Sequence, residues 1–309
     1  MEIIKYLQDK RIFYNITSIK NINKGAGGAS IYKIIDNETE YVLKYCPNSV
    51  NEYIRNEILR ELDFYNLNKK INLPFVPKIT YLENNSNLGI IIVMYYYKPI
   101  EHNEWNNELF LKTIDLYVKI NCLDCNIFNE INIKKEQIIL DNDTKFKSYD
   151  LWNKIIYKHK YYFKNNVIDN IFKMLDLICS ILNNEPHYIC HGDFHPENIL
   201  MNNHEIIICD WQCINIGKNI SEISFFISRA LDFGINIIEN EIVEYYCQKL
   251  SEYKMENVDR QKIQKEKNAS ILYTTFIHWP YFLQNSNIER INIHYNNMYQ
   301  AYNYLINKL

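Results

Sequence analysis

Apolar residues recur at two different spacings along the chain, and the change of spacing divides it into two regions. Before Pro99, most apolar runs are short and rich in β-branched and aromatic side chains, which is typical of β-strands. After Pro99, apolar positions recur three and four residues apart, as on one face of an α-helix. We therefore expect a β-rich N-terminal region that joins a helical C-terminal region near residues 95–99.

The first region is expected to hold five strands and one helix. The small-residue turn Gly-Ala-Gly-Gly-Ala at 25–29 separates the first two strands. The helix is expected over residues 50–67, because Ser49 followed by Glu52 matches a capping box. The expected strands are residues 18–22, 30–35, 40–45, 79–82 and 89–96.

The second region is expected to be mainly helical. Its clearest helix covers residues 167–182, where the apolar side chains occupy one face. Its strand-like pieces flank the polar segment His191-Gly-Asp-Phe-His-Pro-Glu-Asn-Ile-Leu200. The expected helices are residues 108–120, 167–182, 221–231, 241–250, 270–282 and 292–305, and the strand-like pieces are 187–190, 199–201 and 206–209.

The composition indicates a globular protein with enough apolar residues for a large core. The chain has 309 residues, of which 47% are hydrophobic, so its length favours two domains or one domain of two lobes. The formal net charge of -3 does not favour a general nucleic-acid-binding function, because such proteins normally carry a basic excess.

No segment of the sequence favours a membrane or export. The most apolar stretch, residues 88–97, is about half as long as a membrane-spanning helix. The N-terminal residues lack the apolar core of a signal peptide. The eight cysteines are scattered, and several lie within apolar runs, as buried and reduced thiols do. We therefore expect a cytoplasmic protein without membrane or nucleic-acid partners.

The polar segment 191–200 and Asp210 hold the residue types that phosphoryl transfer requires, namely positioned groups and ligands for a charge-neutralising cation. Asp193 can accept the proton of an attacking hydroxyl, so it is the expected catalytic base. Amide and carboxylate oxygens suit Mg²⁺, so Asn198 and Asp210 are the expected metal ligands. A hairpin between them would bring both to its open end. Taken singly, each residue could instead cap local backbone groups.

A second candidate phosphate site lies in the N-terminal region. Backbone N–H groups near Gly25, Gly27 and Gly28, with Ser30 following, can approach phosphate oxygens closely because these residues are small. Lys44 lies on the next expected strand, where its ammonium group could contact the α- and β-phosphates of a nucleotide. Alone, a glycine turn is ordinary in a hairpin, and a strand lysine can extend to solvent.

Two carboxylates project from the apolar face of the helix expected over residues 50–67. A buried carboxylate is costly without a partner, so Glu57 or Glu61 is expected to pair with Lys44. The alternative is a half-exposed helix face on which both glutamates are solvated.

The segment 191–200, followed by Cys209-Asp-Trp-Gln212, resembles the aminoglycoside phosphotransferase and choline kinase-like family of small-molecule kinases. The resemblance implies an α+β, bilobal protein kinase-like fold with a β-rich N-lobe and a mainly helical C-lobe. Residues 1–97 would then form the nucleotide-binding N-lobe. Residues 98–309 would form the C-lobe, which holds the catalytic loop and the acceptor site.

The resemblance also implies further nucleotide contacts. Arg60-Glu61 is similar to the family's N-lobe helix, in which the Glu after Arg pairs with the strand Lys, and this favours Glu61 over Glu57. The strand that ends near Met94 resembles the approach to the hinge between the lobes. Met94, Tyr95 and Tyr97 are therefore expected near the nucleotide base.

The sequence departs from the family pattern after the expected metal-binding Asp. Family members usually have a glycine and then Asp-Leu-Ala, whereas here Gly217 is followed by Glu222-Ile-Ser. Glu222 therefore takes the Asp position and is expected to keep a structural role near the catalytic loop. His191 is expected to support this loop by hydrogen bonds, without a catalytic role.

These observations predict a kinase that uses Mg²⁺ and transfers the γ-phosphate of ATP or GTP to a hydroxyl of a small molecule. A protein kinase is disfavoured because Gly192 replaces the Arg of His-Arg-Asp and Asp-Trp-Gln replaces Asp-Phe-Gly. A non-catalytic pseudokinase is disfavoured because the expected lysine, base and metal ligands are all intact. The sequence leaves open the acceptor, the choice between ATP and GTP, and the oligomeric state.

The acceptor is expected to bind between Asp193 and the C-terminal helices. An aminoglycoside or choline would favour acidic and aromatic linings. The candidate lining residues are Trp152, Glu222, His278, Trp279 and Tyr281, although core packing explains the aromatic ones at least as well.

Overall fold

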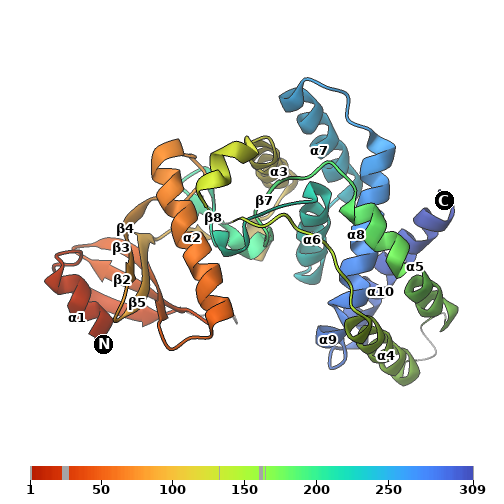
Figure 1. Cartoon of the computed structure of the whole chain (residues 1–309), viewed down its shortest axis with the longest axis horizontal. Helices are drawn as coiled ribbons and strands as arrows, with labels where there is room; N and C mark the ends of the chain where they lie inside the picture. Colours follow the sequence, from red (N-terminus) through yellow and green to blue (C-terminus); the bar gives the residue numbers. More distant parts are fainter. Residues whose placement is uncertain (1, 23–27, 132, 160–162, 164, 309) are drawn as a thin grey trace.

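The N-terminal region is a five-stranded antiparallel sheet, and all five expected strands are confirmed. The computed structural model describes residues 2–22, 28–131, 133–159, 163 and 165–308. Neighbouring strands follow the order β1-β2-β3-β5-β4. The strands are β1 (Ile16–Asn21), β2 (Ser30–Asp36), β3 (Thr39–Pro47), β4 (Ile79–Asn85) and β5 (Gly89–Tyr95) (Figure 1).

Two helices cover opposite faces of this sheet (Figure 1). Successive side chains of the central strand β5 point to opposite faces because a strand has a period of two residues. Ile91 and Val93 pack in one core cluster with α1 (Glu2–Asp9), a helix that the sequence analysis did not predict. Ile90 belongs to the cluster on the other face, which α2 (Glu52–Ile71) covers.

The helix α2 begins and ends later than expected. Asn51 is its N-cap, and the side-chain oxygen of Asn51 accepts a 2.8 Å hydrogen bond from the N–H of Tyr53. The expected capping box at Ser49 was therefore wrong, because asparagine caps a helix as well as serine does and here lies directly before the first turn. Asn72 ends the helix in the left-handed conformation, with φ of 53°.

The C-terminal region is mainly helical, as expected, and its helices pack around two cores. One core continues from the sheet through α2 to α3, α6 and α7, and the other joins α4, α5, α8 and α10. Among the described residues, none of the helices has the length and apolarity needed to cross a membrane. The helices are α3 (Asn107–Asn121), α4 (Asn142–Lys158), α5 (Asn165–Asn183), α6 (Asn219–Asp232), α7 (Glu239–Lys254), α8 (Arg260–Ile277), α9 (Pro280–Leu283) and α10 (Ile288–Ile306).

Two helices differ from the sequence expectation. The single helix expected over residues 270–282 is wrong, because α8 ends at Ile277 and Pro280 begins α9. A proline lacks the N–H that a helix interior needs but fits the first position of a new helix. The helix α4 was not expected, because its polar residues interrupt the apolar pattern.

Short strands place the polar segment 191–200 between the sheet and the C-terminal helices (Figure 1). The chain enters through β7, which pairs with β10, and continues into the hairpin of β8 and β9. β6 pairs with β8 and so connects the hairpin to the segment that leaves the sheet. These strands are β6 (Lys98–Pro99), β7 (Tyr188–Cys190), β8 (Ile199–Asn202), β9 (Glu205–Ile208) and β10 (Asn215–Gly217).

Candidate active site

Asp193 lies in the loop after β7, and buried groups hold the backbone of this loop. Gly192 has φ of +91°, and a Cβ added there would overlap with the carbonyl group of Cys213, so only glycine fits. The Nε2 of His191 donates to the carbonyl oxygen of Cys209 at 2.9 Å, and its Nδ1 accepts from the N–H of Asp193 at 3.3 Å. Burial lowers the pKa of His191 to about 4. The expected supporting role of His191 is confirmed.

Glu222, on α6, holds the same loop from the other side. Its carboxylate accepts hydrogen bonds from the N–H of His191 at 2.8 Å and from the N–H of Gly192. The buried hydroxyl of Tyr117 donates to it at 2.8 Å. Burial raises the pKa of Glu222 to about 7, and these hydrogen bonds oppose the increase. The structural role expected for Glu222 is therefore confirmed.

The side chains of Asp193 and Asn198 face each other across the loop. The Nδ2 of Asn198 donates to the carbonyl oxygen of Asp193 at 2.9 Å and lies 3.3 Å from its Oδ2. The Nε2 of His195 lies 3.4 Å from the same Oδ2, a contact that the sequence did not predict. Burial would raise the pKa of Asp193, but His195, His191 and Asn198 together outweigh burial and hold this pKa below its ordinary value. Asp193 is therefore a carboxylate at neutral pH.

Asn198 and Asp210 lie at the open end of the hairpin of β8 and β9, as expected. Ile199 pairs with Ile208, and the N–H of Cys209 donates to the carbonyl oxygen of Asn198 at 3.0 Å. The Nδ2 of Asn198 donates to Asp193, whereas its Oδ1 accepts no hydrogen bond from another described residue. Both expected metal ligands thus present side-chain oxygens at one end of the hairpin.

Lys44 lies between two carboxylates from different parts of the chain. Its Nζ is 2.5 Å from Glu61 Oε2 and 2.6 Å from Asp210 Oδ1. Burial alone would lower the pKa of Lys44, but the charges of Glu61 and Asp210 raise it above its ordinary value. Of the two glutamates considered from the sequence, Glu61 contacts Lys44, and Glu57 makes no ion pair with it in the described part of the chain.

Further hydrogen bonds fasten α2 to the segment after Asp210. Arg60 Nη1 donates to the carbonyl oxygen of Gln212 at 2.9 Å, and the Oε1 of Gln212 lies 3.3 Å from Lys44 Nζ. On α2 itself, the hydroxyl of Tyr65 donates to Glu61 Oε1 at 3.0 Å. The sequence analysis did not predict these contacts, because they join residues whose spacing carries no motif.

The expected glycine turn is only partly described. Gly25 and Gly27 lie outside the described residues. Gly28 has φ of +69°, and an added Cβ would lie 2.7 Å from the side chain of Ile54, so Gly28 lies close against α2. Ser30 begins β2 and pairs with Tyr45, directly beside Lys44.

The expected hinge leaves one backbone donor available. The N–H of Tyr95 donates to the carbonyl oxygen of Lys78 at 3.1 Å, and the N–H of Tyr96 donates to that of Glu40 at 2.9 Å. The N–H of Tyr97 donates to no other residue in the described part of the chain. Met94 is buried at the end of β5.

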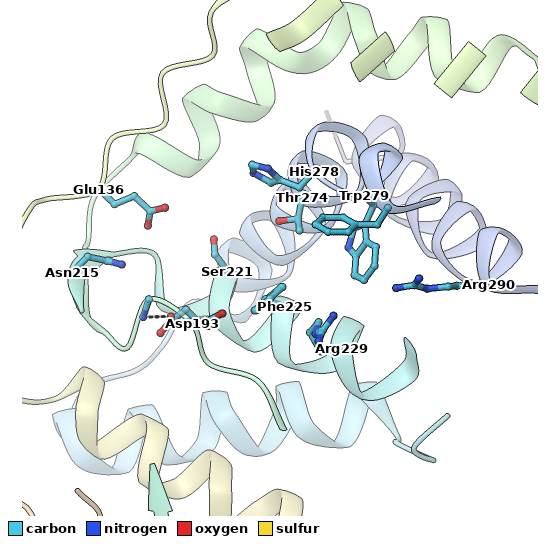
Figure 2. A pocket seen from close by; sticks show the side chains of 13 residues that line it. Glu136, Asp193, Asn215, Ser221, Phe225, Arg229, Thr274, His278, Trp279 and Arg290 are labelled. Atoms are coloured by element: carbon cyan, nitrogen blue, oxygen red, sulfur yellow. Dashed lines mark hydrogen bonds between the residues drawn. The ribbon is translucent and has the colours of Figure 1, made fainter. Parts of the chain in front are cut away.

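A cavity of about 330 Å³ has Asp193 in its lining (Figure 2). Of the candidates proposed from the sequence, Glu222, His278 and Trp279 line it. Trp152 is instead fully buried and donates to the carbonyl oxygen of Phe276, and Tyr281 does not reach the cavity. The sequence analysis missed several lining residues, among them Glu136, Asn215, Phe225, Arg229 and Arg290.

Comparison with known proteins supports the resemblance seen in the motifs. The model of the phosphotransferase enzyme family matches residues 140–253, which include Asp193, Asn198 and Asp210. The match covers less than half of the chain, and it supports over these residues the resemblance seen in the sequence. No curated protein matches the sequence of this chain.

Solved structures of small-molecule kinases share the fold of this chain. An ADP-bound aminoglycoside phosphotransferase, APH(2'')-Ib, is 15% identical, with a TM-score of 0.56 over 97% of both chains. Amicoumacin kinase is 12% identical, with a TM-score of 0.62 over 97% of this chain and 93% of its own. Choline kinase from Cryptosporidium parvum is 12% identical, with a TM-score of 0.62 over 99% of this chain and 96% of its own. The expected kinase-like α+β fold is confirmed.

Proposed function

We propose that this chain transfers the γ-phosphate of ATP or GTP to a hydroxyl group of a small molecule bound in the cavity beside Asp193. One observation carries the proposal. Asp193 lines that cavity and also contacts Asn198, which lies with Asp210 at the end of the hairpin. A single carboxylate therefore lies between a place for an acceptor and a place for phosphate oxygens, as phosphoryl transfer requires.

In this proposal Asp193 is the catalytic base. Its carboxylate accepts a hydrogen bond from the acceptor hydroxyl, orients the oxygen for attack and takes the proton as the new P–O bond forms. The lowered pKa of Asp193 keeps it ionised before the reaction. The hydrogen bond from Asn198 and the contact with His195 fix its direction.

Asn198 and Asp210 are the proposed magnesium ligands. Their side chains offer the hard oxygen donors that Mg²⁺ prefers, and the hydrogen bonds of Asn198 Nδ2 leave its Oδ1 for a cation. No group of three His, Cys, Asp or Glu side chains suited to a metal occurs within the described residues. The two ligands therefore fit an ion that also takes oxygens from the nucleotide, where it would offset phosphate charge.

The remaining site residues are proposed to hold the nucleotide. Lys44 contacts phosphate oxygens and is kept in place by Glu61. Backbone groups of the turn that includes Gly25, Gly27, Gly28 and Ser30 surround the phosphates. The N–H of Tyr97 binds the base beside Met94 and Tyr95.

The proposal assigns nucleotide binding to residues 1–97 and the catalytic loop and acceptor site to residues 98–309. It also places the protein in the cytoplasm, where its nucleotide substrates are made. The eight cysteines support this location, because all are free thiols and reducing compartments keep thiols in this form. A protein substrate is disfavoured because α6 begins at Asn219, soon after Asp210, and leaves no room for a regulated activation loop.

The test is nucleotide consumption with MgATP and MgGTP across a panel of hydroxyl acceptors. The panel contains aminoglycosides, choline, ethanolamine, sugars, homoserine, sterols and a generic protein. Asp193→Asn serves as the blank, and Asp150→Asn, at an exposed position on α4, serves as the matched control. We expect one small-molecule class to stimulate turnover in the wild type and control but not in the blank. Stimulation by the protein alone would overturn the proposal.

A further inference from the structure

Lys44 already has a protein acceptor for each of its donors. Its Nζ lies 2.5 Å from Glu61 Oε2, 2.6 Å from Asp210 Oδ1 and 3.3 Å from Gln212 Oε1. An ammonium group has three N–H donors, and these three side chains account for all of them. In the proposed function, Lys44 donates to a phosphate oxygen of the nucleotide. One of the three acceptors must therefore give up its place when the nucleotide binds.

The carboxylate of Glu61 is the acceptor least able to leave Lys44. Its side chain is 1% exposed, and the hydroxyl of Tyr65 donates to its other oxygen, Oε1, at 3.0 Å. Without Lys44, this carboxylate would be a buried charge that lacks a cation, which is costly. The shortest of the three contacts therefore stays in place.

Asp210 can keep its contact with Lys44 and still bind a metal. Its Oδ1 contacts Lys44, whereas its Oδ2 accepts no hydrogen bond from another described residue. A carboxylate can serve two cations through its two oxygens. The magnesium ion proposed at Asp210 therefore does not require this ion pair to open.

Gln212 is the acceptor that a phosphate oxygen can replace at the lowest cost. Its contact with Lys44 is the longest of the three, and its amide carries no charge. The residue is partly exposed, and this contact is the one hydrogen bond that its side chain makes with the described residues. The backbone is held separately, because Arg60 Nη1 donates to the carbonyl oxygen of Gln212 at 2.9 Å. The side chain can therefore turn away while the backbone stays in place.

We propose that Gln212 is a positioning residue that holds the third donor of Lys44 in the empty site and releases it to a phosphate oxygen of the nucleotide. The inference rests on the proposed function, which brings the phosphates to Lys44. A charged phosphate oxygen forms a stronger hydrogen bond with the ammonium group than a neutral amide does. Until the phosphate arrives, the amide oxygen keeps a buried donor satisfied.

The neutral amide is the property of Gln212 on which the inference depends. A glutamate of the same length would place a third carboxylate beside Lys44, in addition to Glu61 and Asp210. It would compete for the same donor with a full charge, and it would repel the phosphates. A methionine has nearly the same length but offers Lys44 only a weak acceptor. These two substitutions therefore separate the charge of the side chain from its volume.

Direct binding to the whole protein tests the inference. ATP and inorganic triphosphate are titrated by calorimetry against the wild type, Gln212→Glu and Gln212→Met. Each titration is run with Mg²⁺ and with EDTA, because an introduced carboxylate could itself bind Mg²⁺. Gln8→Glu and Gln8→Met, at an exposed position on α1, are the matched controls. In parallel, nitrogen NMR follows the exchange of the Lys44 ammonium protons with water in the empty protein.

With EDTA, we expect Gln212→Glu to weaken the binding of both ligands by about tenfold or more, because the new charge stays on Lys44. Gln212→Met should bind both ligands within about threefold of the wild type. In the empty protein, Gln212→Met should speed the exchange of the Lys44 ammonium protons, because one donor loses its protein acceptor. The Gln8 controls should match the wild type in every measurement.

Equal affinities in Gln212→Glu and Gln212→Met, whether lowered or not, would overturn the inference, because the charge at this place would then not matter. A loss of about tenfold in Gln212→Met alone would also overturn it, because the amide itself would then hold the phosphate. Unchanged proton exchange at Lys44 in Gln212→Met would mean that the two side chains do not meet in the empty protein.

Phosphoryl transfer, followed in the same variants, separates this inference from the proposed function. The expected affinity pattern, without transfer to any acceptor, would contradict the proposed function and support the inference. Transfer by the wild type, with equal ATP affinities in both variants, would support the function and overturn the inference. Failure of ATP and of triphosphate to bind the wild type would overturn both. In steady-state kinetics, Gln212→Glu should change the nucleotide KM more than kcat, because Gln212 leaves Lys44 before the chemical step.

Discussion

The proposed nucleotide side and the proposed acceptor side of Asp193 differ in how their charged groups are satisfied. On the nucleotide side, Lys44 contacts Glu61 and Asp210, and Arg60 fastens α2 to the segment after Asp210. On the acceptor side, Glu136 and the Oδ1 of Asn215 have no partner within the described residues. The first side is therefore held by pairs of opposite charge, whereas the second leaves polar oxygens without a protein partner.

If the proposed function is correct, this difference separates the part of the site that binds the nucleotide from the part that selects the acceptor. The nucleotide and the metal make the same demands in every kinase, so a paired and buried arrangement suits them. Acceptors differ, and a cavity lined by a few unsatisfied groups can select among them. Four substitutions or conditions test this comparison.

The largest expected effect is that of Asp193→Asn, which removes the group shared by both sides. We expect turnover to fall by about 10²–10⁴-fold, the typical contribution of a general base. MgATP affinity should be nearly unchanged, because the amide keeps the shape of the carboxylate. Steady-state kinetics and nucleotide titration check both parts, and retained turnover would remove the base assignment.

Lys44→Met breaks the paired arrangement on the nucleotide side. It leaves Glu61, whose side chain is 1% exposed, without its cation. We expect the free energy of unfolding at neutral pH to fall by about 3 kcal/mol, the lower end of the cost of an unpaired buried charge. Urea denaturation measures the loss. Lys112→Met, which breaks the exposed pair with Glu108, is the control and should leave the midpoint unchanged.

Gly192→Ala disturbs the loop that joins the two sides. Alanine at φ of +91° is strained, and its Cβ would overlap with the carbonyl of Cys213. Gly234→Ala is a matched control, because Gly234 has φ of +70° but no atom within 4 Å of an added Cβ. We expect Gly192→Ala to cost about 2 kcal/mol more stability than the control. Equal losses would mean that the loop adapts to the overlap.

The smallest expected effect is on the pH dependence of stability. Glu222 and His191 change the free energy of unfolding in opposite directions as the pH changes. In the folded protein the pKa of Glu222 is raised from 4.5 to about 7. Its contribution to the free energy of unfolding is therefore lost as the pH rises from 4.5 to 7. In the folded protein the pKa of His191 is lowered from 6.5 to about 4. Its contribution to the free energy of unfolding is therefore lost as the pH falls from 6.5 to 4. Between pH 4.5 and 6.5, these two contributions should nearly cancel in the wild type.

Glu222→Gln should expose the contribution of His191. The free energy of unfolding of this variant, relative to the wild type, should decrease as pH falls from 6.5 to 4.5, with a slope of at most about 1.4 kcal/mol per pH unit. Urea denaturation at several pH values measures the slope. Parallel pH profiles for the variant and the wild type would contradict the raised pKa of Glu222.

Much of the fold was predictable because it follows local periodicity. The five strands of the sheet and helices such as α5 were found from spacing alone. The helices α1 and α4 were missed because α1 is short and α4 is interrupted by polar residues. The break before Pro280 was also missed, because Ser270 to Phe282 reads as one continuous apolar pattern.

The candidate site was predictable where its residues follow one another in the sequence. Asp193, Asn198 and Asp210 were identified because their spacing places them in one loop and at the end of one hairpin. Of the residues that line the cavity, Asp193, Glu222, His278 and Trp279 were anticipated. Glu136 and Asn215 come from separate segments and carry no motif, so nothing in the sequence indicated that both line the cavity.

The sequence by itself determined the residue types, their order and their local elements, because capping, periodicity and hairpin spacing act over a few positions. The sequence anticipated the pair of Lys44 with Glu61, but tertiary structure decided that Asp210 is the second partner of Lys44. Lys44 and Asp210 are 166 positions apart in the chain, yet their side chains lie 2.6 Å apart. Whether a carboxylate is neutralised or left for a ligand depends on how distant segments pack around it, and a local pattern does not contain that information.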